Sequence, residues 1–482
     1  MAKSLNKNLV LTSVKTVASM VFPLITFPYV TRVLSASGIG EYNYANSLIS
    51  YFTLIASLGI GTYAIREGAR IRDDKQKMSD FASEMLSLNL FFTIITYLAL
   101  GLCFLLFDEF RSYGIAISIF SISIIFKVIG VDWVFSIYED YWYITVRSLA
   151  FQVLSVICLF VFVRSESDVY WYIAINVLSS VGSNVFNFFY ARKYINFHLS
   201  FNRSIFGHLK AVVVIFSTTL ATMIYVNADQ TMLGWMRGTT EVGYYAVACK
   251  MYNVLKSIFN ALVPVFMARL SYNFVVCKQE FDKIFRHAYN LLILFTIPLA
   301  VGSLFFSRDI ILVLSGEEYL SAETGMKLLF FSMIFATLGN LFSSGGLLPA
   351  GKEKLMLRAT MMGAVINVIL NALLIPFLGC SGATFATLIT ETTIFFVLFV
   401  SFKKYVSTKI GIGHTAKCIA STVPFVIISA LRNYLEVTSE WIGIGLICIC
   451  AILYFSMLLI LRDELVVQLV KTSLRKLRNF RS

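Results

Sequence analysis

The chain has 482 residues, of which 58% are apolar and 14% are charged, and its mean hydropathy is +0.78. Soluble domains average about 45–50% apolar and about 25% charged residues. This composition excludes a water-soluble globule and a disordered chain, and it indicates an integral membrane protein. We therefore treat the net charge of +13 first as a topology signal, and we expect no nucleic-acid partner.

Apolar runs long enough to cross a bilayer, which takes about 20 residues, follow one another along the whole chain. We predict about 14 transmembrane helices, at residues 8–31, 41–64, 80–106, 113–138, 141–163, 168–194, 209–234, 242–266, 284–306, 322–348, 355–378, 380–402, 411–432 and 441–461. The first run is long and lacks a small-residue cleavage site. We therefore expect an uncleaved spanning helix instead of a signal peptide.

Lysines and arginines are distributed unequally between the two sides that these helices define. With the N-terminus in the cytoplasm, 28 of them fall in inside segments and 6 fall in outside segments. The positive-inside rule then predicts that both the N and C termini are cytoplasmic. The predicted fold class is an all-α multi-pass membrane protein.

The two halves of the sequence resemble each other at an offset of about 200 residues. Residues 39–45 align with residues 242–248 at an offset of 203, and Asn89 aligns with Asn290 in the next predicted helix of each half. An even number of helices separates the copies, so the repeat is parallel, and it predicts two six-helix lobes with a substrate site between them. The predicted parts are an N-terminal lobe (1–198), a C-terminal lobe (199–405), two extra helices 13 and 14 (406–465) and a basic cytoplasmic tail (466–482).

Polar residues form stripes on two repeat-related helices. Asn46 and Ser50 share one face of the second predicted helix. Four residues share one face of the eighth, namely Lys250, Asn253, Lys256 and Asn260. Hydroxyl and amide groups often bond neighbouring helices. Two lysines on one mid-membrane stripe repel each other, however, and favour water or an anion.

Charged residues inside the predicted helices are few. Four lysines lie deep in them, namely Lys15, Lys127, Lys250 and Lys256, and each costs about 2.5–3.5 kcal/mol on insertion scales. We expect Arg147 and Lys327, nearer helix ends, to extend toward the interface. The excess of cations between the lobes predicts an anionic substrate group.

Three acids, Asp132, Asp229 and Glu391, are candidates for proton or ion coupling or for a gate. Alternatives stay open for each kind of charge. Asp229 also fits a helix cap, Glu391 also fits an ion pair with a lysine, and Lys127 also fits an ion pair with another helix. The eight cysteines show no paired spacing, so we interpret them as small apolar residues. We expect no metal and no cofactor.

Three segments resemble a known family: PLITFPYVTRVLSASGIGEYNYANS (23–47), SLGIGTYAIREGARIRDD (57–74) and DQTMLGWMRGTTEVGYYAVACK (229–250). They are similar to the polysaccharide biosynthesis proteins, the O-antigen and capsule repeat-unit flippases of the multidrug, oligosaccharidyl-lipid and polysaccharide exporter superfamily. The resemblance implies a non-enzymatic flippase in the bacterial cell membrane. Such a protein carries an undecaprenyl-pyrophosphate-linked oligosaccharide outward by alternating access, with the polyprenyl tail in lipid.

The resemblance also implies site residues and partners. In related peptidoglycan-precursor flippases, basic residues of the first, second and eighth helices contact the headgroup, and the matching positions here are Arg32, Arg66 and Arg269. The expected partners are the lipid-linked glycan and the bilayer. A polysaccharide polymerase and a chain-length regulator are further candidates, and we expect a monomer.

Two alternatives belong to other classes. A multidrug antiporter of the same superfamily expels organic cations and would carry an acidic cavity, which the sign of the intramembrane charges disfavours. A membrane enzyme such as a polymerase or glycosyltransferase would need paired carboxylates or a large extramembrane loop, and neither is evident in the sequence.

Overall fold

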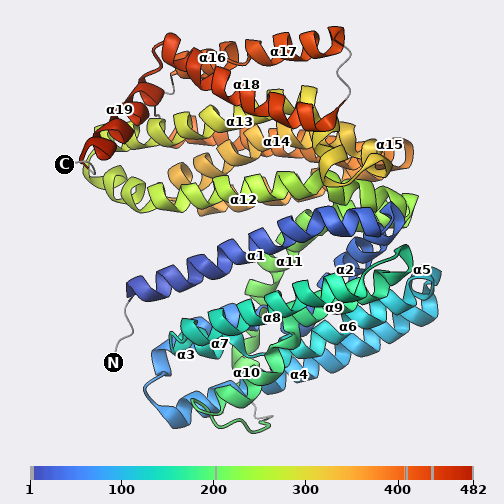
Figure 1. Cartoon of the computed structure of the whole chain (residues 1–482). Coiled ribbons are helices and arrows are strands. Elements are labelled where there is room, and N and C mark those ends of the chain that lie inside the picture. The colour runs from blue at the N-terminus through green and yellow to red at the C-terminus, as the bar shows by residue number, and fades with distance from the viewer. Residues whose placement is uncertain (1–4, 201–203, 407, 409–410, 436–438, 480–482) are drawn as a thin grey trace. The chain divides into compact units, whose positions relative to one another are not determined.

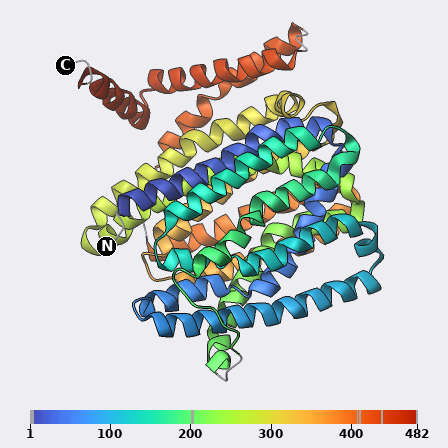
Figure 2. The same cartoon turned by 60° about the horizontal axis from the view of Figure 1, so that its bottom comes forward.

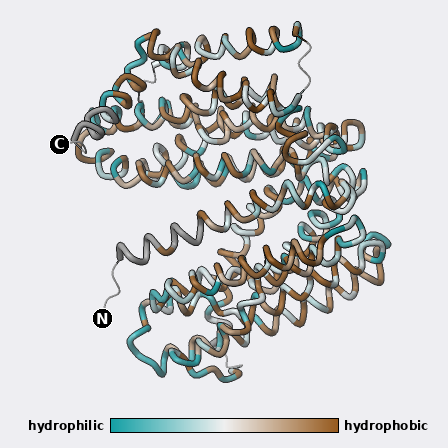
Figure 3. Tube along the Cα trace, in the orientation of Figure 1, coloured by the Kyte–Doolittle hydropathy of each residue, from teal (hydrophilic) through white to brown (hydrophobic). Residues whose placement is uncertain are grey.

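The computed structural model describes residues 5–200, 204–406, 408, 411–435 and 439–479. These residues form helices and no strand (Figure 1), which confirms the all-α prediction. Ten helices in this part of the chain are long and apolar enough to cross a membrane. The count of about 14 crossings and the cytoplasmic termini stay predictions. Figure 3 shows hydrophobic residues along the helices and hydrophilic residues in connections such as that between α3 and α4.

The chain divides into two compact units, Met1–Gly243 and Tyr244–Ser482. The division lies within a helix and differs from the predicted lobe boundary at 198/199, because α11 packs on α2, α3 and α4 of unit 1. The helices of unit 1 are α1 (Leu5–Val33), α2 (Ala36–Ser57), α3 (Ile60–Ile71), α4 (Lys75–Leu106), α5 (Asp108–Ser112), α6 (Gly114–Ile129), α7 (Asp132–Ile137), α8 (Tyr141–Phe162), α9 (Val169–Val177), α10 (Asn184–Ala191) and α11 (Ser204–Arg237).

Left-handed backbone interrupts two helices that the sequence predicts as continuous. Leu58 (φ 46°) and Gly59 (φ 70°) separate α2 from α3, and Val131 (φ 38°) separates α6 from α7. A hydropathy profile does not reveal these breaks, because the residues that make them are apolar or small. Glycine tolerates a positive φ, whereas leucine and valine do so at a steric cost. The predicted helices 41–64 and 113–138 are each two segments.

A buried apolar cluster holds one end of unit 1 together. It includes Ile60 and Tyr63 of α3, Met78 of α4 and Trp133 and Phe135 at α7. At the opposite end, a capping box closes the turn before α9, where Asp168 accepts hydrogen bonds from the backbone of Arg164 and Ser165. These bonds lower the pKa of Asp168 because they favour its ionised form.

Two repeat-related glycines lie where α2 crosses the first turn of α12 (Thr239–Val276). A Cβ at Gly40 would overlap the carbonyl oxygen of Thr239, and a Cβ at Gly243 would overlap that of Ala36. Both pairs are related by the offset of 203, and α4 and α13 also begin 203 residues apart, at Lys75 and Lys278. The contact is therefore reciprocal, because each glycine meets a backbone carbonyl of the segment that contains the other.

Unit 2 contains the rest of α12 and the helices that follow it. They are α13 (Lys278–Leu314), α14 (Glu323–Asn340), α15 (Glu353–Tyr405), α16 (Ile412–Ala420), α17 (Val423–Tyr434), α18 (Glu440–Ile460) and α19 (Glu464–Asn479). Gly379 (φ 54°, ψ −131°) breaks α15 where the sequence predicts two helices, 355–378 and 380–402. Short 3-10 and π-helical turns precede and follow α14 (Glu317–Ala322 and Leu341–Leu347).

Helix α13 is the centre of unit 2, in contact with α14, α16, α17 and α18. At one end, the guanidinium of Arg432 on α17 donates two hydrogen bonds to the buried carboxylate of Asp309, at 2.5 and 2.7 Å. The chain changes direction between α18 and α19 (Figures 1 and 2), where Arg462 has φ 49°. The two extra helices are thus held to α13 by polar contacts as well as by apolar packing.

Candidate functional site

The lysine stripe of α12 consists of Lys250, Asn253, Lys256 and Asn260 and lies in unit 2. One of its lysines, Lys256, is paired with an acid. The Nζ of Lys256 is 2.8 Å from Oε1 of Glu391 on α15, and it donates a second hydrogen bond of 2.9 Å to the hydroxyl of Tyr252. The side chains of Lys256 and Glu391 are 25% and 9% exposed. Of the two interpretations open for Glu391, the geometry matches the ion pair with a lysine.

The other members of the stripe have different surroundings. Lys250 is half-buried and Asn253 is exposed. Asn260 accepts a hydrogen bond of 2.9 Å from Asn340 at the end of α14, and Asn340 in turn accepts one of 3.1 Å from Ser344 in the π-helical turn. Sequence reasoning missed Tyr252, Asn340 and Ser344. The π-helical turn contains two consecutive glycines, Gly345 and Gly346, but hydropathy alone gives no sign of it.

The opposite face of α12 lines an apolar cavity of about 450 Å³. At 100° per residue, Leu255, Ile258 and Leu262 lie across the helix from the stripe that contains Lys250 and Lys256. The remaining wall comes from α13, α14, α17 and α18. Unit 2 therefore presents a polar stripe and an apolar cavity on opposite sides of one membrane helix.

Three predicted cations of unit 1 are exposed and lie at or near helix ends. Arg32 is in the last turn of α1, and Lys127 is in the last turn of α6. Arg66 lies on α3, with its Nε 2.8 Å from Oε1 of Glu67. The side chain of Lys15 lies outside the described residues.

The remaining predicted residues of unit 1 are polar or acidic. On α2, Asn46 is exposed, and its carbonyl accepts a hydrogen bond of 2.7 Å from Ser50. Asp229 of α11 is buried. The role of Asp229 in coupling or gating stays a prediction.

Asp132, whose side chain is 46% exposed, belongs to a polar cluster that sequence reasoning missed. Its Oδ1 accepts hydrogen bonds from Asn187 at 2.6 Å and from Arg147 at 3.2 Å. The Arg147 side chain is 10% exposed and is therefore enclosed by unit 1, and its expected extension toward the interface stays a prediction. Asp132 and Arg147 lie equally far from the turn at residues 139–140. That spacing places them at one level of an antiparallel hairpin, and it could have revealed the pair.

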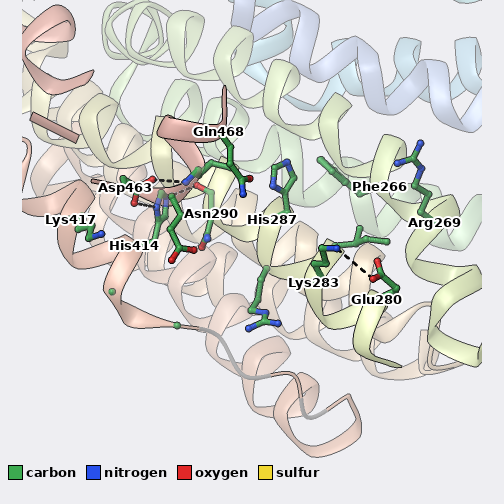
Figure 4. Close-up of a pocket in the computed structure, with 16 residues that line it drawn as sticks. Phe266, Arg269, Glu280, Lys283, His287, Asn290, His414, Lys417, Asp463 and Gln468 are labelled. Carbon is green, nitrogen blue, oxygen red and sulfur yellow. Dashed lines mark hydrogen bonds and ion pairs between the residues drawn. The ribbon is translucent and has the colours of Figure 1, made fainter. Parts of the chain in front are cut away.

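Arg269 lies far along α12 from the lysine stripe. It is 13 residues beyond Lys256, which is about 20 Å at 1.5 Å per residue. It lines a second cavity of about 770 Å³, whose wall comes from α12, α13, α16 and α19 (Figure 4). Within unit 2 the predicted cations therefore form two separate groups.

The model of one family, described as "Polysaccharide biosynthesis protein", matches residues 5–270. This match covers more than half of the chain. The chain belongs to the polysaccharide biosynthesis protein family. The resemblance inferred from residues 23–47, 57–74 and 229–250 is thereby confirmed, and so is the assignment to multi-pass membrane proteins.

Relatives of this family member extend over most of its length. It is 23% identical over 401 residues to a "Putative O-antigen transporter" of Shigella dysenteriae, across 82% of this chain and 99% of the relative. It is 22% identical over 384 residues to the "Capsular polysaccharide biosynthesis protein CapF" of Staphylococcus aureus, across 77% and 92% of the two chains. The solved structure titled "Lipid II flippase MurJ, inward closed conformation" shares its fold, with a TM-score of 0.73, 17% identity and coverage of 94% and 99%.

Proposed function

We propose that this protein is a flippase that moves an undecaprenyl-pyrophosphate-linked oligosaccharide repeat unit across the bacterial cell membrane. The transported unit is a precursor of O-antigen, capsule or exopolysaccharide, and translocation proceeds by alternating access of the two lobes. The protein supplies a path and no catalytic group. Membership in the polysaccharide biosynthesis family and the names of the relatives above support this class of substrate.

One observation in unit 2 carries the proposal furthest, namely the two faces of α12. A lipid-linked glycan joins an anionic pyrophosphate and polar sugars to a long isoprenoid chain. Lys250, Asn253 and Lys256 offer charge and hydrogen bonds on one face of α12. The cavity of about 450 Å³ on the other face offers an apolar wall. A helix with one polar face and one apolar face suits a ligand that has one charged end and one apolar end.

The predicted headgroup residues fall into a deep group and a second group of three arginines. Lys250 and Lys256 belong to the deep group, and at the offset of 203 their repeat-related counterparts on α2 are Ser47 and Thr53. Arg32, Arg66 and Arg269 are the residues that the family resemblance implies. We propose that they contact the pyrophosphate at successive positions along its path, because about 20 Å separates Arg269 from Lys256 along α12.

The multidrug antiporter alternative needs an acid that is available to a cation. Among the acids of unit 2, Glu391 is the one that the sequence places deep in the membrane, and its carboxylate is engaged by Lys256 at 2.8 Å. An organic cation would have to displace that lysine. The ion pair therefore disfavours Glu391 as a binding site for a cationic substrate.

The test is complementation of a flippase-null strain with Lys250→Gln and Lys256→Gln together. We expect surface polysaccharide to be lost while the variant still inserts in the membrane, since two cations leave a site that must offset a doubly anionic group. Lys403→Gln with Lys404→Gln is the matched control, because it removes two lysines from the inner end of α15. Unchanged polysaccharide in the α12 variant would refute the assignment of the deep cations.

Uptake of an isotope-labelled lipid-linked sugar into vesicles separates the flippase from its alternatives. The flippase predicts protection of the labelled lipid inside wild-type vesicles and no change in drug resistance of cells. Export of organic cations without uptake of the lipid would support the antiporter instead.

A further inference from the structure

The second cavity of unit 2 is lined, apart from Arg269, by residues that the proposed transport path does not use. It holds about 770 Å³ and lies where α12 ends, α13 begins and the chain passes from α18 to α19. Figure 4 shows Lys283 and His287 of α13 at its middle, Arg269 at one end and Lys417 at the other. The positive-inside count predicts that all these segments lie on the cytoplasmic side.

His414 and Asp463 form a buried polar link at one end of this cavity. Their side chains are 8% and 3% exposed, and Nδ1 of His414 is 2.8 Å from Oδ2 of Asp463. The other ring nitrogen, Nε2, is 2.9 Å from the carbonyl oxygen of Asn290 on α13. A carbonyl oxygen accepts only, so Nε2 carries a proton, and the His414–Asp463 pair shares one further proton and is neutral overall.

The same carboxylate fixes the start of α19. Its Oδ1 accepts hydrogen bonds from the backbone N–H groups of Leu465 (3.2 Å) and Val466 (3.3 Å), as an N-cap does. These two bonds anchor the Asp463 side chain at the start of α19. Helices α13 and α16 and the start of α19 are thereby joined at one point of the cavity wall.

The charges that line the cavity do not balance. His414 offsets Asp463, and Lys283 lies 3.6 Å from Glu280. Three cations then remain in the lining, Arg269, Arg286 and Lys417, against one acid, Glu464. Arg286 uses Nε for the carbonyl of Asp282, and Lys417 donates to the carbonyl of Arg462. Both keep further N–H groups for a ligand.

We propose that this cavity binds a phosphate-bearing anion from the cytoplasmic side, with Arg286 and Lys417 as its principal contacts. Arginine and lysine donate charge-assisted hydrogen bonds to phosphate oxygens. Phe266, Ile284 and Leu465 supply apolar wall beside them. The phosphate could come from the headgroup of an anionic phospholipid or from a soluble diphosphate, since both present the same oxygens. Binding here does not depend on the transport function proposed above.

The experiment uses the full-length protein and two kinds of probe. Native mass spectrometry compares retention of phosphatidylglycerol with that of phosphatidylcholine. Calorimetric titration with inorganic pyrophosphate is done on protein in phosphatidylcholine nanodiscs. The variant is Arg286→Gln with Lys417→Gln, and we expect its affinity to fall roughly tenfold or more, because it loses two charge-assisted hydrogen bonds to the phosphate oxygens. Arg269 is left unchanged because the family resemblance also assigns it to transport.

Two further variants make the result decisive. Lys354→Gln with Arg358→Gln removes the same charge from exposed positions of α15 and should bind as the wild type does. Arg286→Lys with Lys417→Arg keeps both charges and should retain most of the affinity. It keeps the proposal testable if the glutamine variant fails to fold. Selective phosphatidylglycerol binding identifies a lipid headgroup, and pyrophosphate binding identifies a soluble ligand. Absence of both in the wild type, or equal binding by all variants, would overturn the proposal.

Discussion

Lys256 and Glu391 illustrate how one contact changes the meaning of an intramembrane charge. By sequence alone, Lys256 is a candidate contact for an anionic substrate, and Glu391 fits either a coupling role or an ion pair with a lysine. Because their charged groups lie 2.8 Å apart, each offsets the other, and removal of one leaves the other charge buried. Breaking such a pair usually costs about 3–5 kcal/mol, whereas replacing both partners with neutral groups can be nearly neutral.

We therefore predict that Lys256→Gln lowers the midpoint of thermal unfolding in detergent and that Lys256→Gln with Glu391→Gln restores most of it. Vesicle uptake of the labelled lipid should remain low in the double variant if Lys256 contacts the pyrophosphate. Recovery of both stability and uptake would show that Lys256 serves only to neutralise Glu391.

His414 makes a second prediction at the residue scale. Replacing His414 with alanine leaves Oδ2 of the 3%-exposed Asp463 without its cation. We expect a loss of about 3–5 kcal/mol, as for other buried pairs that lose one partner, seen as a lower unfolding midpoint in detergent. His287→Ala removes an exposed imidazole from the same cavity and should change stability little. Equal midpoints for both variants would contradict this account of the link.

At the scale of elements, the crossing of α2 with the first turn of α12 depends on two glycines. Backbone approaches backbone at both positions, so a methyl group at either meets a carbonyl oxygen that cannot move aside. The reciprocal geometry follows from the offset of 203 that is visible in the sequence. It assigns to Gly40 and Gly243 the same structural role in two copies of one motif.

Gly40→Ala and Gly243→Ala should each reduce the yield of monodisperse protein, and by similar amounts. Overpacking typically costs about 1–3 kcal/mol, and a clash with backbone is at the high end of that range. Gly101→Ala on α4 is the control, because a Cβ there has no neighbour within 4 Å. A normal yield for only one of the two crossing variants would contradict the reciprocity.

For the whole molecule, the prediction concerns orientation. The 28 to 6 distribution of basic residues places residues 75 and 354 inside and residue 166 outside. In a variant without the native cysteines, Glu166→Cys should react with a membrane-impermeant maleimide in intact cells. Lys75→Cys and Lys354→Cys should react only after the membrane is opened. All three side chains are exposed, so burial would not explain a failure to react, and the opposite pattern would invert the topology.

The sequence by itself determined the class of this protein, its family and most of its helices. Apolar runs of about 20 residues report helices directly, because the bilayer leaves backbone polar groups no other partner. The duplication and the family segments are likewise properties of residue order. Even the break at Gly379 falls between two predicted helices.

Only the tertiary structure decided which charges meet. Lys256 pairs with Glu391, which lies 135 positions away in the sequence. Asp132 pairs with Arg147 across a hairpin, and His414 contacts both Asp463 and Asn290, which come from other parts of the chain. No periodicity within one helix encodes such pairs, since each depends on how neighbouring helices are rotated and aligned. That is why the sequence could supply the candidate cations, while the fold decided that one is neutralised deep in the membrane and others surround a separate cavity at the helix ends.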